Sequence, residues 1–128
     1  MPPRRRASSG SPFEPRIGFS RAVRAGSHIA VAATAAIWPD DQVIDDAGEQ
    51  ARRIFEIIAQ SLEELDASLD HVVRTRVFLV DPADGAAVGR VHGEVFGSVR
   101  PASGFIVVKG FLDPRWRVEI EADAIVEG

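Results

Sequence analysis

The strongest secondary-structure signal in the chain is DAGEQARRIFEIIAQSLEEL, which spans residues 46–65. Asp46 can cap a helix by accepting a backbone hydrogen bond, and Glu49 follows three positions on, as in a capping box. From there, apolar residues recur at helical spacing, and charged or amide side chains fill the positions between them. The apolar positions are Ala47, Ala51, Ile54, Ile57, Ile58, Leu62 and Leu65. This period predicts an amphipathic helix that lies against a sheet.

Strands are predicted on both sides of this helix. Upstream, residues 20–23 and 29–34 flank Gly26, whose easy access to positive φ favours a β-hairpin. Downstream, residues 72–80 are rich in β-branched and aromatic side chains, which favours a strand. The helix is therefore expected to join a hairpin to a third strand.

A second helix and two more strands complete the pattern. Asp81 as cap and Pro82 at the first helical position predict where the second helix begins, and Gly97 predicts where it ends. Residues 104–108 and 116–126 are expected to be strands, and the last one alternates apolar and charged side chains. The order β-β-α-β-α-β-β predicts an α+β fold, with one sheet and both helices on one of its faces. The opposite face would hold short and polar groups, which suits a surface that symmetric assembly covers.

The amino-terminal segment, residues 1–15, differs in composition from the rest. It is rich in proline and serine and cannot bury much apolar surface, so we expect a flexible tail. Arg4, Arg5 and Arg6 could contact an anionic partner, although a lone triplet is shorter than a usual basic patch. Residues 16–128 are then expected to form a single domain, which the length of 128 residues allows.

Composition excludes several classes of site. The chain has no cysteine, which rules out disulfides, thiolate catalysis and cysteine-ligated metals. His28, His71 and His92 lack metal-ligand spacing, and no metal or other cofactor is expected. The net charge of −4 argues against a nucleic-acid partner. No apolar run reaches the length of a membrane span, and the arginines near the start precede no apolar signal segment, so we expect a cytoplasmic protein.

Several segments, taken in their order and spacing, resemble the Rid family, also called the YjgF or L-PSP endoribonuclease family. These segments are residues 17–26, 73–81, 96–97, 100–102 and 118–122. The resemblance implies a chorismate-mutase-like α+β fold and a homotrimer with clefts between subunits. It also implies a small-molecule ligand, because well-studied members hydrolyse enamines and imines derived from amino acids to a keto acid and ammonia.

The resemblance also implies a set of site residues. In such members an arginine clamps the substrate carboxylate and a glutamate positions or activates water. Glu119 matches that glutamate, and Phe19 stands where many members have tyrosine. Ala33 replaces a glycine whose backbone faces the ligand, and Phe105 replaces a small residue of the cleft. Ser103 stands at the position of the arginine.

The serine at position 103 changes what the cleft could bind. A guanidinium grips a carboxylate with two charged hydrogen bonds, whereas a hydroxyl offers one neutral bond. The departure argues against deamination of carboxylate-bearing imines unless another cation substitutes. The candidate cations are Arg76, Arg100 and Arg115. Ser103 is not expected to be a nucleophile, because nothing marks a serine–histidine–aspartate set.

Three hypotheses follow. The first is a hydrolase similar to 2-iminobutanoate/2-iminopropanoate deaminases but with an altered substrate, in which Glu119 is the general base rather than a solvated carboxylate. The second is a non-catalytic trimer that binds a small molecule or a partner. The third is a ribonuclease, which only the older family name implies and which the acidic charge argues against.

Overall fold

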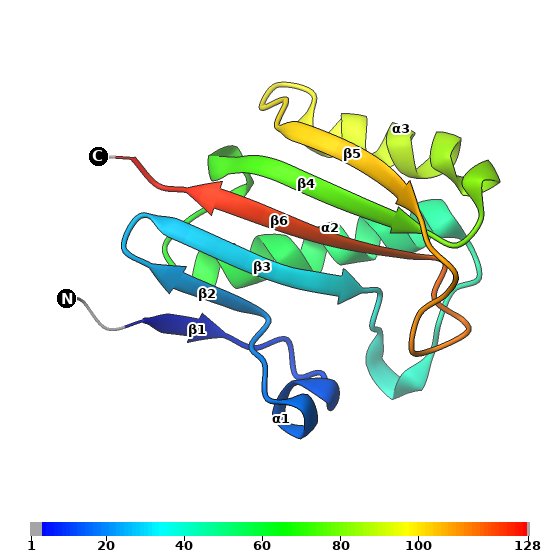
Figure 1. Ribbon diagram of the computed structural model, residues 1–128, viewed down its shortest axis with the longest axis horizontal. Coiled ribbons are helices and arrows are strands. Elements are labelled where there is room, and N and C mark those ends of the chain that lie inside the picture. The colour runs from blue at the N-terminus through cyan, green and yellow to red at the C-terminus, as the bar shows by residue number, and fades with distance from the viewer. Residues whose placement is uncertain (1–3, 128) are drawn as a thin grey trace.

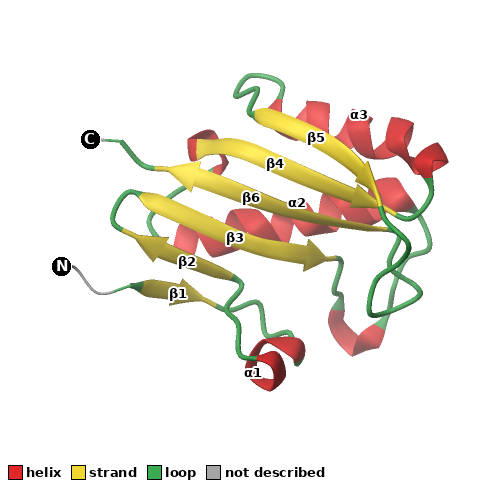
Figure 2. Ribbon diagram, in the orientation of Figure 1, coloured by secondary structure: helices red, strands yellow, loops and turns green. Residues whose placement is uncertain are grey.

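The computed structural model describes residues 4–127 and contains a six-stranded sheet with the order β1-β2-β3-β6-β4-β5. The strands are β1 (Arg5–Ala7), β2 (Ala22–Ala25), β3 (His28–Ala35), β4 (Val72–Leu79), β5 (Ala102–Val107) and β6 (Val118–Ile125). The α-helices are α1 (Phe13–Ile17), α2 (Ala47–Glu64) and α3 (Gly85–Phe96). Short 3-10 helices are η1 (Pro39–Asp41), η2 (Leu69–His71) and η3 (Pro82–Asp84). Both long helices, α2 and α3, lie on the same face of the sheet (Figure 1, Figure 2), so the predicted α+β architecture is confirmed.

The topology places the last strand in the middle of the sheet. β6 pairs antiparallel with β3 on one side and with β4 on the other. β4 and β5 are parallel and are connected through α3, whereas β1, β2 and β3 follow each other antiparallel. The predicted hairpin is β2–β3, and Gly26 takes a φ of 63° in its two-residue turn. In Figure 1, β5 and β1 form the two edges of the sheet.

The core lies between the sheet and the two helices. As predicted, Asp46 caps α2, and its Oδ1 accepts a hydrogen bond from the backbone N–H of Glu49 at 2.9 Å. Among the fully buried core side chains are Ile54, Ile58 and Leu62 of α2, Val77 of β4 and Ile120 of β6. Burial of each such side chain contributes about 1.5–3 kcal/mol, so this layer is a main source of the fold's stability.

The amino-terminal segment differs from the flexible tail expected for residues 1–15. Within it, β1 pairs with β2 along the edge of the sheet, and α1 begins at Phe13. Arg5 donates from Nη1 to Asp66 at 2.7 Å, and Glu14 is buried. Composition suggested a tail because the partners of these residues are distant in sequence and not visible locally. Residues 1–3 and 128 lie outside the described residues.

The boundaries of the second helix and of the last strands also differ slightly. Asp81 caps η3, and its Oδ1 accepts from the N–H of Ala83 at 2.9 Å, whereas α3 itself begins at Gly85. Its carboxyl end at Gly97 is as predicted. β5 begins earlier, at Ala102. Pro82 therefore starts the 3-10 helix η3, which leads directly into α3.

The face of the sheet away from the helices carries charge, as expected. Glu119, Glu121 and Asp123 follow one another on β6, between buried apolar neighbours. Arg76 of the adjacent β4 contacts Glu121 at 2.7 Å and Asp123 at 3.7 Å. None of the helices in the described range is long and apolar enough to cross a bilayer.

Candidate functional site

A small pocket of about 120 Å³ lies near α1 and the start of β6. We call it the Glu119 pocket. It brings together three of the five predicted site residues, Glu119, Phe19 and Ala33. Arg21 and Trp116 also line it. Residues from a loop, from β3 and from β6 thus meet at one place.

Glu119 is the chemically distinctive group of this pocket. It is half-buried on β6, where it stands opposite Ala35 of β3 and Phe78 of β4. Burial raises the pKa of the Glu119 carboxyl, and the positive charge of Arg21 opposes only part of that rise. A carboxyl with a raised pKa is better matched to proton transfer near neutral pH than an ordinary surface glutamate.

Arg21 is a site residue that the sequence did not single out. It is 4% exposed and donates from Nη1 to the carbonyl of Ala33 at 2.8 Å and to Thr34 Oγ1 at 3.2 Å. Its guanidinium carbon lies 5.3 Å from the ring centroid of Phe19. Arg21 therefore holds two of the predicted site residues. Its buried partner Glu14 lies in the expected tail, so no local pattern could reveal this role.

The charge of Arg21 is balanced by Glu14. The two side chains are each 5% exposed, and Arg21 Nε lies 3.5 Å from Glu14 Oε2. Burial by itself raises the pKa of Glu14, but hydrogen bonds from Ser9 and Ser8 and the charge of Arg21 outweigh it and leave the pKa below its usual value. Burial also lowers the pKa of Arg21, against the attraction of Glu14. Glu14 stays ionised at neutral pH, and the cation is neutralised inside the protein.

Apolar side chains form the remaining wall of the Glu119 pocket. Phe13 of α1 packs edge-on against Trp116, with ring centroids 6.0 Å apart. Leu112 also lines the pocket and is 72% exposed. A carboxylate with a raised pKa thus faces aromatic and aliphatic surface rather than free cations.

Ser103 and Phe105 lie elsewhere in the same chain. Both are on the edge strand β5, and β4 separates β5 from β6. Thr75 Oγ1 donates to Ser103 Oγ at 2.8 Å and lies 2.8 Å from His92 Nε2 on α3. The Phe105 ring lies 6.3 Å from the ring of His92. These two side chains therefore face the helix side of the sheet, whereas Glu119 faces the other side.

A second hollow, of about 270 Å³, has Ser103 among its lining residues. Arg76, one of the three proposed substitute cations, lines it together with Arg74. Arg76 is already paired with Glu121, as described above. Arg115 is not available either, because Asp113 and Asp41 bind its Nη2 at 2.7 and 3.0 Å.

His92 connects to Ser103 through Thr75 and packs among aromatic rings. Its ring centroid is 4.9 Å from that of Phe96 and 5.8 Å from that of Phe55. Burial lowers the pKa of His92, so the imidazole is neutral at physiological pH and acts as a hydrogen-bonding partner of Thr75. In residues 4–127, no group of three or more histidine and acidic side chains could hold a metal ion.

Comparisons with known proteins agree on one family. The model of the family described as Endoribonuclease L-PSP matches residues 10–126. An uncharacterized protein of Streptomyces coelicolor is 42% identical over 121 residues, which cover 94% of this chain and 90% of that protein. The 3-aminoacrylate deaminase RutC of Acinetobacter baylyi is 35% identical over 83 residues, or 65% of each chain. The crystal structure of Rv2704 of Mycobacterium tuberculosis, a member of the YjgF/YER057c/UK114 family, superposes with a TM-score of 0.89 at 40% identity, covering 97% of this chain and all of the other.

Proposed function

Because this chain belongs to the Endoribonuclease L-PSP family, also called the Rid or YjgF family, we propose that it hydrolyses a small imine or enamine in the Glu119 pocket. The observation that carries the proposal is the half-buried Glu119 carboxyl, whose pKa burial raises. The name of the Acinetobacter relative, 3-aminoacrylate deaminase, supports chemistry at a C–N bond.

The proposed reaction is addition of water to the carbon of a C=N bond. Glu119 takes a proton from the attacking water and delivers it to the nitrogen, which gives a carbinolamine. Glu119 then transfers the hydroxyl proton of this intermediate to the nitrogen, and the C–N bond breaks as the C=O bond forms. The products are a carbonyl compound and ammonia. Arg21 acts as a positioning residue, because it fixes the Ala33 carbonyl and its charge limits how far the Glu119 pKa rises.

The proposed substrate carries no carboxylate next to the reacting carbon. Ser103 supplies no charge at the position where a clamp is expected, and the Arg21 charge is already matched by Glu14. The Phe13 and Trp116 rings favour an apolar substituent instead. A small aliphatic or aromatic imine fits these features.

We further propose that the active form is a homotrimer in which β5 of one subunit completes the Glu119 pocket of its neighbour. All of β5 is exposed, and Phe105, Ile106 and Val107 are 42%, 44% and 55% exposed. Within the described residues, β5 pairs only with β4, so its other edge is open. An exposed apolar edge strand is normally covered in the working state of a protein. This arrangement would bring Ser103 and Phe105 to Glu119.

The test is ammonia release from imines generated in situ by amine or amino-acid oxidation. We expect the wild type to accelerate hydrolysis of an imine without a carboxylate, and Glu119→Gln to lose about 100-fold or more of that acceleration. The matched control is Glu121→Gln, which changes a carboxylate on the same face of β6 and should keep the activity. Equal loss in both variants would refute the role of Glu119.

A second arm tests the substrate class. With 2-iminopropionate, which bears a carboxylate, Ser103→Arg should raise activity above that of the wild type, because it adds a two-pronged cation. A wild type that already prefers 2-iminopropionate would contradict the proposed substrate.

The second candidate function is a non-catalytic binding module. The serine at position 103 favours it, because the charged clamp is the feature that this chain lacks. A wild type that accelerates no imine, together with an inactive Ser103→Arg variant, would select this alternative.

A further inference from the structure

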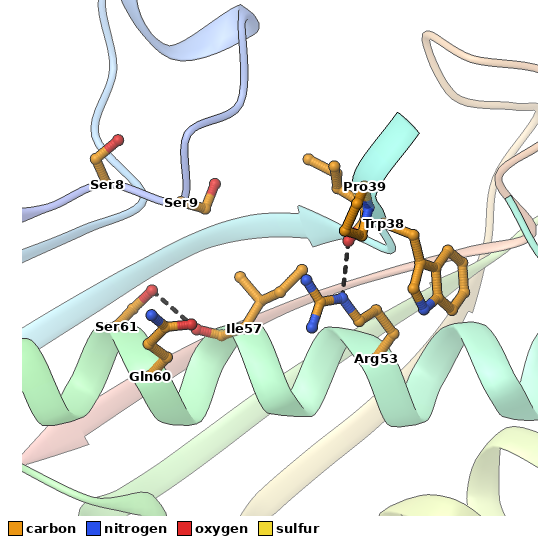
Figure 3. A pocket seen from close by; sticks show the side chains of 9 residues that line it. Ser8, Ser9, Trp38, Pro39, Arg53, Ile57, Gln60 and Ser61 are labelled. Atoms are coloured by element: carbon orange, nitrogen blue, oxygen red, sulfur yellow. Dashed lines mark hydrogen bonds between the residues drawn. The ribbon is translucent and has the colours of Figure 1, made fainter. Parts of the chain in front are cut away.

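We infer that a separate hollow of about 270 Å³, which we call the Arg53 pocket, binds a small organic carboxylate. It lies between the loop that carries Ser8 and Ser9, the start of η1 at Trp38 and Pro39, and the α2 helix (Figure 3). This inference does not rest on the proposed hydrolysis, because Glu119 does not line this pocket.

The guanidinium of Arg53 is the recognition group. Its Nε donates to the carbonyl of Ile37 at 2.7 Å, which fixes the plane of the group over the pocket (Figure 3). In residues 4–127, no carboxylate lies within ion-pair distance of Arg53, and its two Nη groups make no hydrogen bond. The neighbouring Arg52, by contrast, binds Glu94 at 2.8 Å. A half-buried cation with a fixed fork and no counter-charge is a ready partner for an anion.

The other polar groups of the pocket carry no negative charge that could balance Arg53, and most of them are hydrogen-bonded within the protein. Ser61 donates its hydroxyl to the carbonyl of Ile57 at 2.9 Å (Figure 3), and Ser9 donates to Glu14. Ser8 Oγ accepts from the N–H of Gly10 at 3.2 Å. Among the residues that line this pocket, the charged donor is thus Arg53, and the exposed amide of Gln60 lies beside it.

The remaining wall determines the class of ligand. Ile57 offers apolar surface in this pocket, and Trp38 also lines it. A carboxylate with a short hydrocarbon chain can pair with the guanidinium and place its chain against this apolar wall. A phosphate group carries about 1.5–2 negative charges at neutral pH, so one guanidinium would leave part of its charge unmatched. The volume suits a ligand of few atoms.

The two tryptophans allow binding here to be separated from binding at the Glu119 pocket. Trp38 lines the Arg53 pocket, and Trp116 lines the Glu119 pocket. Butyrate titrated into the wild type should shift the indole N–H signal of Trp38 in a ¹H–¹⁵N spectrum, with a Kd on the order of millimolar. The neutral isostere butyramide and inorganic phosphate should bind at least about tenfold more weakly.

Variants assign the effect to Arg53. Arg53→Gln should weaken butyrate binding about tenfold or more, and Arg53→Lys, which keeps the charge but not the fork, should weaken it less. Arg52→Gln, one position along the helix, should bind as the wild type does. The inference is overturned by unchanged butyrate binding in Arg53→Gln, by equal binding of butyramide, by tighter binding of phosphate, or by a shift of Trp116 alone. Because butyramide and phosphate are tested on the wild type, the result does not depend on the folding of any variant.

Discussion

Replacing Glu14 by glutamine should destabilise the protein, because it leaves the Arg21 guanidinium buried without its counter-charge. The substitution preserves the size of the side chain and keeps an oxygen that can accept from Ser9. It removes only the negative charge, which lies 3.5 Å from Arg21 Nε in a setting where both side chains are 5% exposed.

The expected cost is about 3 kcal/mol, the lower end of the roughly 3–5 kcal/mol for breaking a buried ion pair. Three contacts hold the cost at the lower end. Arg21 keeps its hydrogen bonds to Ala33 and Thr34, and the charge of Glu119 still attracts it. Small domains are stable by about 5–15 kcal/mol, so the loss is easily measured.

The pH dependence gives a second signature. The folded pKa of Glu14 is lowered, so its stabilisation is complete above the unfolded pKa and is lost as pH falls through the lower folded value. The difference between the wild type and Glu14→Gln should therefore be constant near neutral pH and shrink below about pH 4.

The assay is urea unfolding followed by far-UV circular dichroism, at one protein concentration because association would make stability concentration-dependent. The control is Glu94→Gln, which breaks the exposed pair with Arg52 and should cost far less stability than Glu14→Gln, because solvent screens this pair. In an Arg21→Met background, Glu14→Gln should cost clearly less, because no cation is left unpaired. A Glu14→Gln cost no larger than that of the control would refute the buried-pair argument.

Three further predictions concern the site, the loop behind it and the edge strand. Because burial raises the pKa of Glu119, its charged form costs stability as pH rises above the unfolded pKa. Glu119→Gln should thus be more stable than the wild type near pH 8 and match it below about pH 4 in thermal melts; a less stable variant at pH 8 would contradict this. Gln50 is fully buried, donates to the carbonyls of Ile44 and Arg115 and accepts from the N–H of Arg117. Gln50→Leu should therefore cost at least about 3 kcal/mol in urea unfolding, and a cost below about 1 kcal/mol would argue against it. Ile106→Lys on β5 should dissociate the proposed trimer in light scattering, whereas Ile44→Lys, equally exposed outside the sheet, should not; a trimer that survives Ile106→Lys would exclude β5 from the interface.

Much of the fold could be predicted because its signals are local. The cap at Asp46, the apolar stripe of α2 and the turn at Gly26 depend on residues within a few positions of each other. The alternation along β6 likewise follows from backbone geometry, which sends successive side chains to opposite faces. These features could be predicted without any knowledge of tertiary contacts.

The candidate site was less predictable because its parts meet only through pairings between distant segments. Glu119, Phe19 and Ala33 do share a pocket, but Arg21, which holds Phe19 and Ala33, gave no local signal among the 15 basic residues. Its partner lies in a segment whose composition predicted a tail. Burial of a charge depends on the counter-charge that folding brings to it, and sequence spacing does not reveal that partner.

The sequence by itself thus determined the two long helices, the strands from β2 to β6, the order of these elements and the face that each long helix buries, because these follow from backbone periodicity and capping. It did not reveal β1 and α1. Tertiary structure alone decided that β6 inserts between β3 and β4, which leaves β5 at the edge. That insertion places Ser103 two strands away from Glu119 and on the opposite face of the sheet. Strand order is set by the packing of whole elements against one core, and no short stretch of residues encodes it.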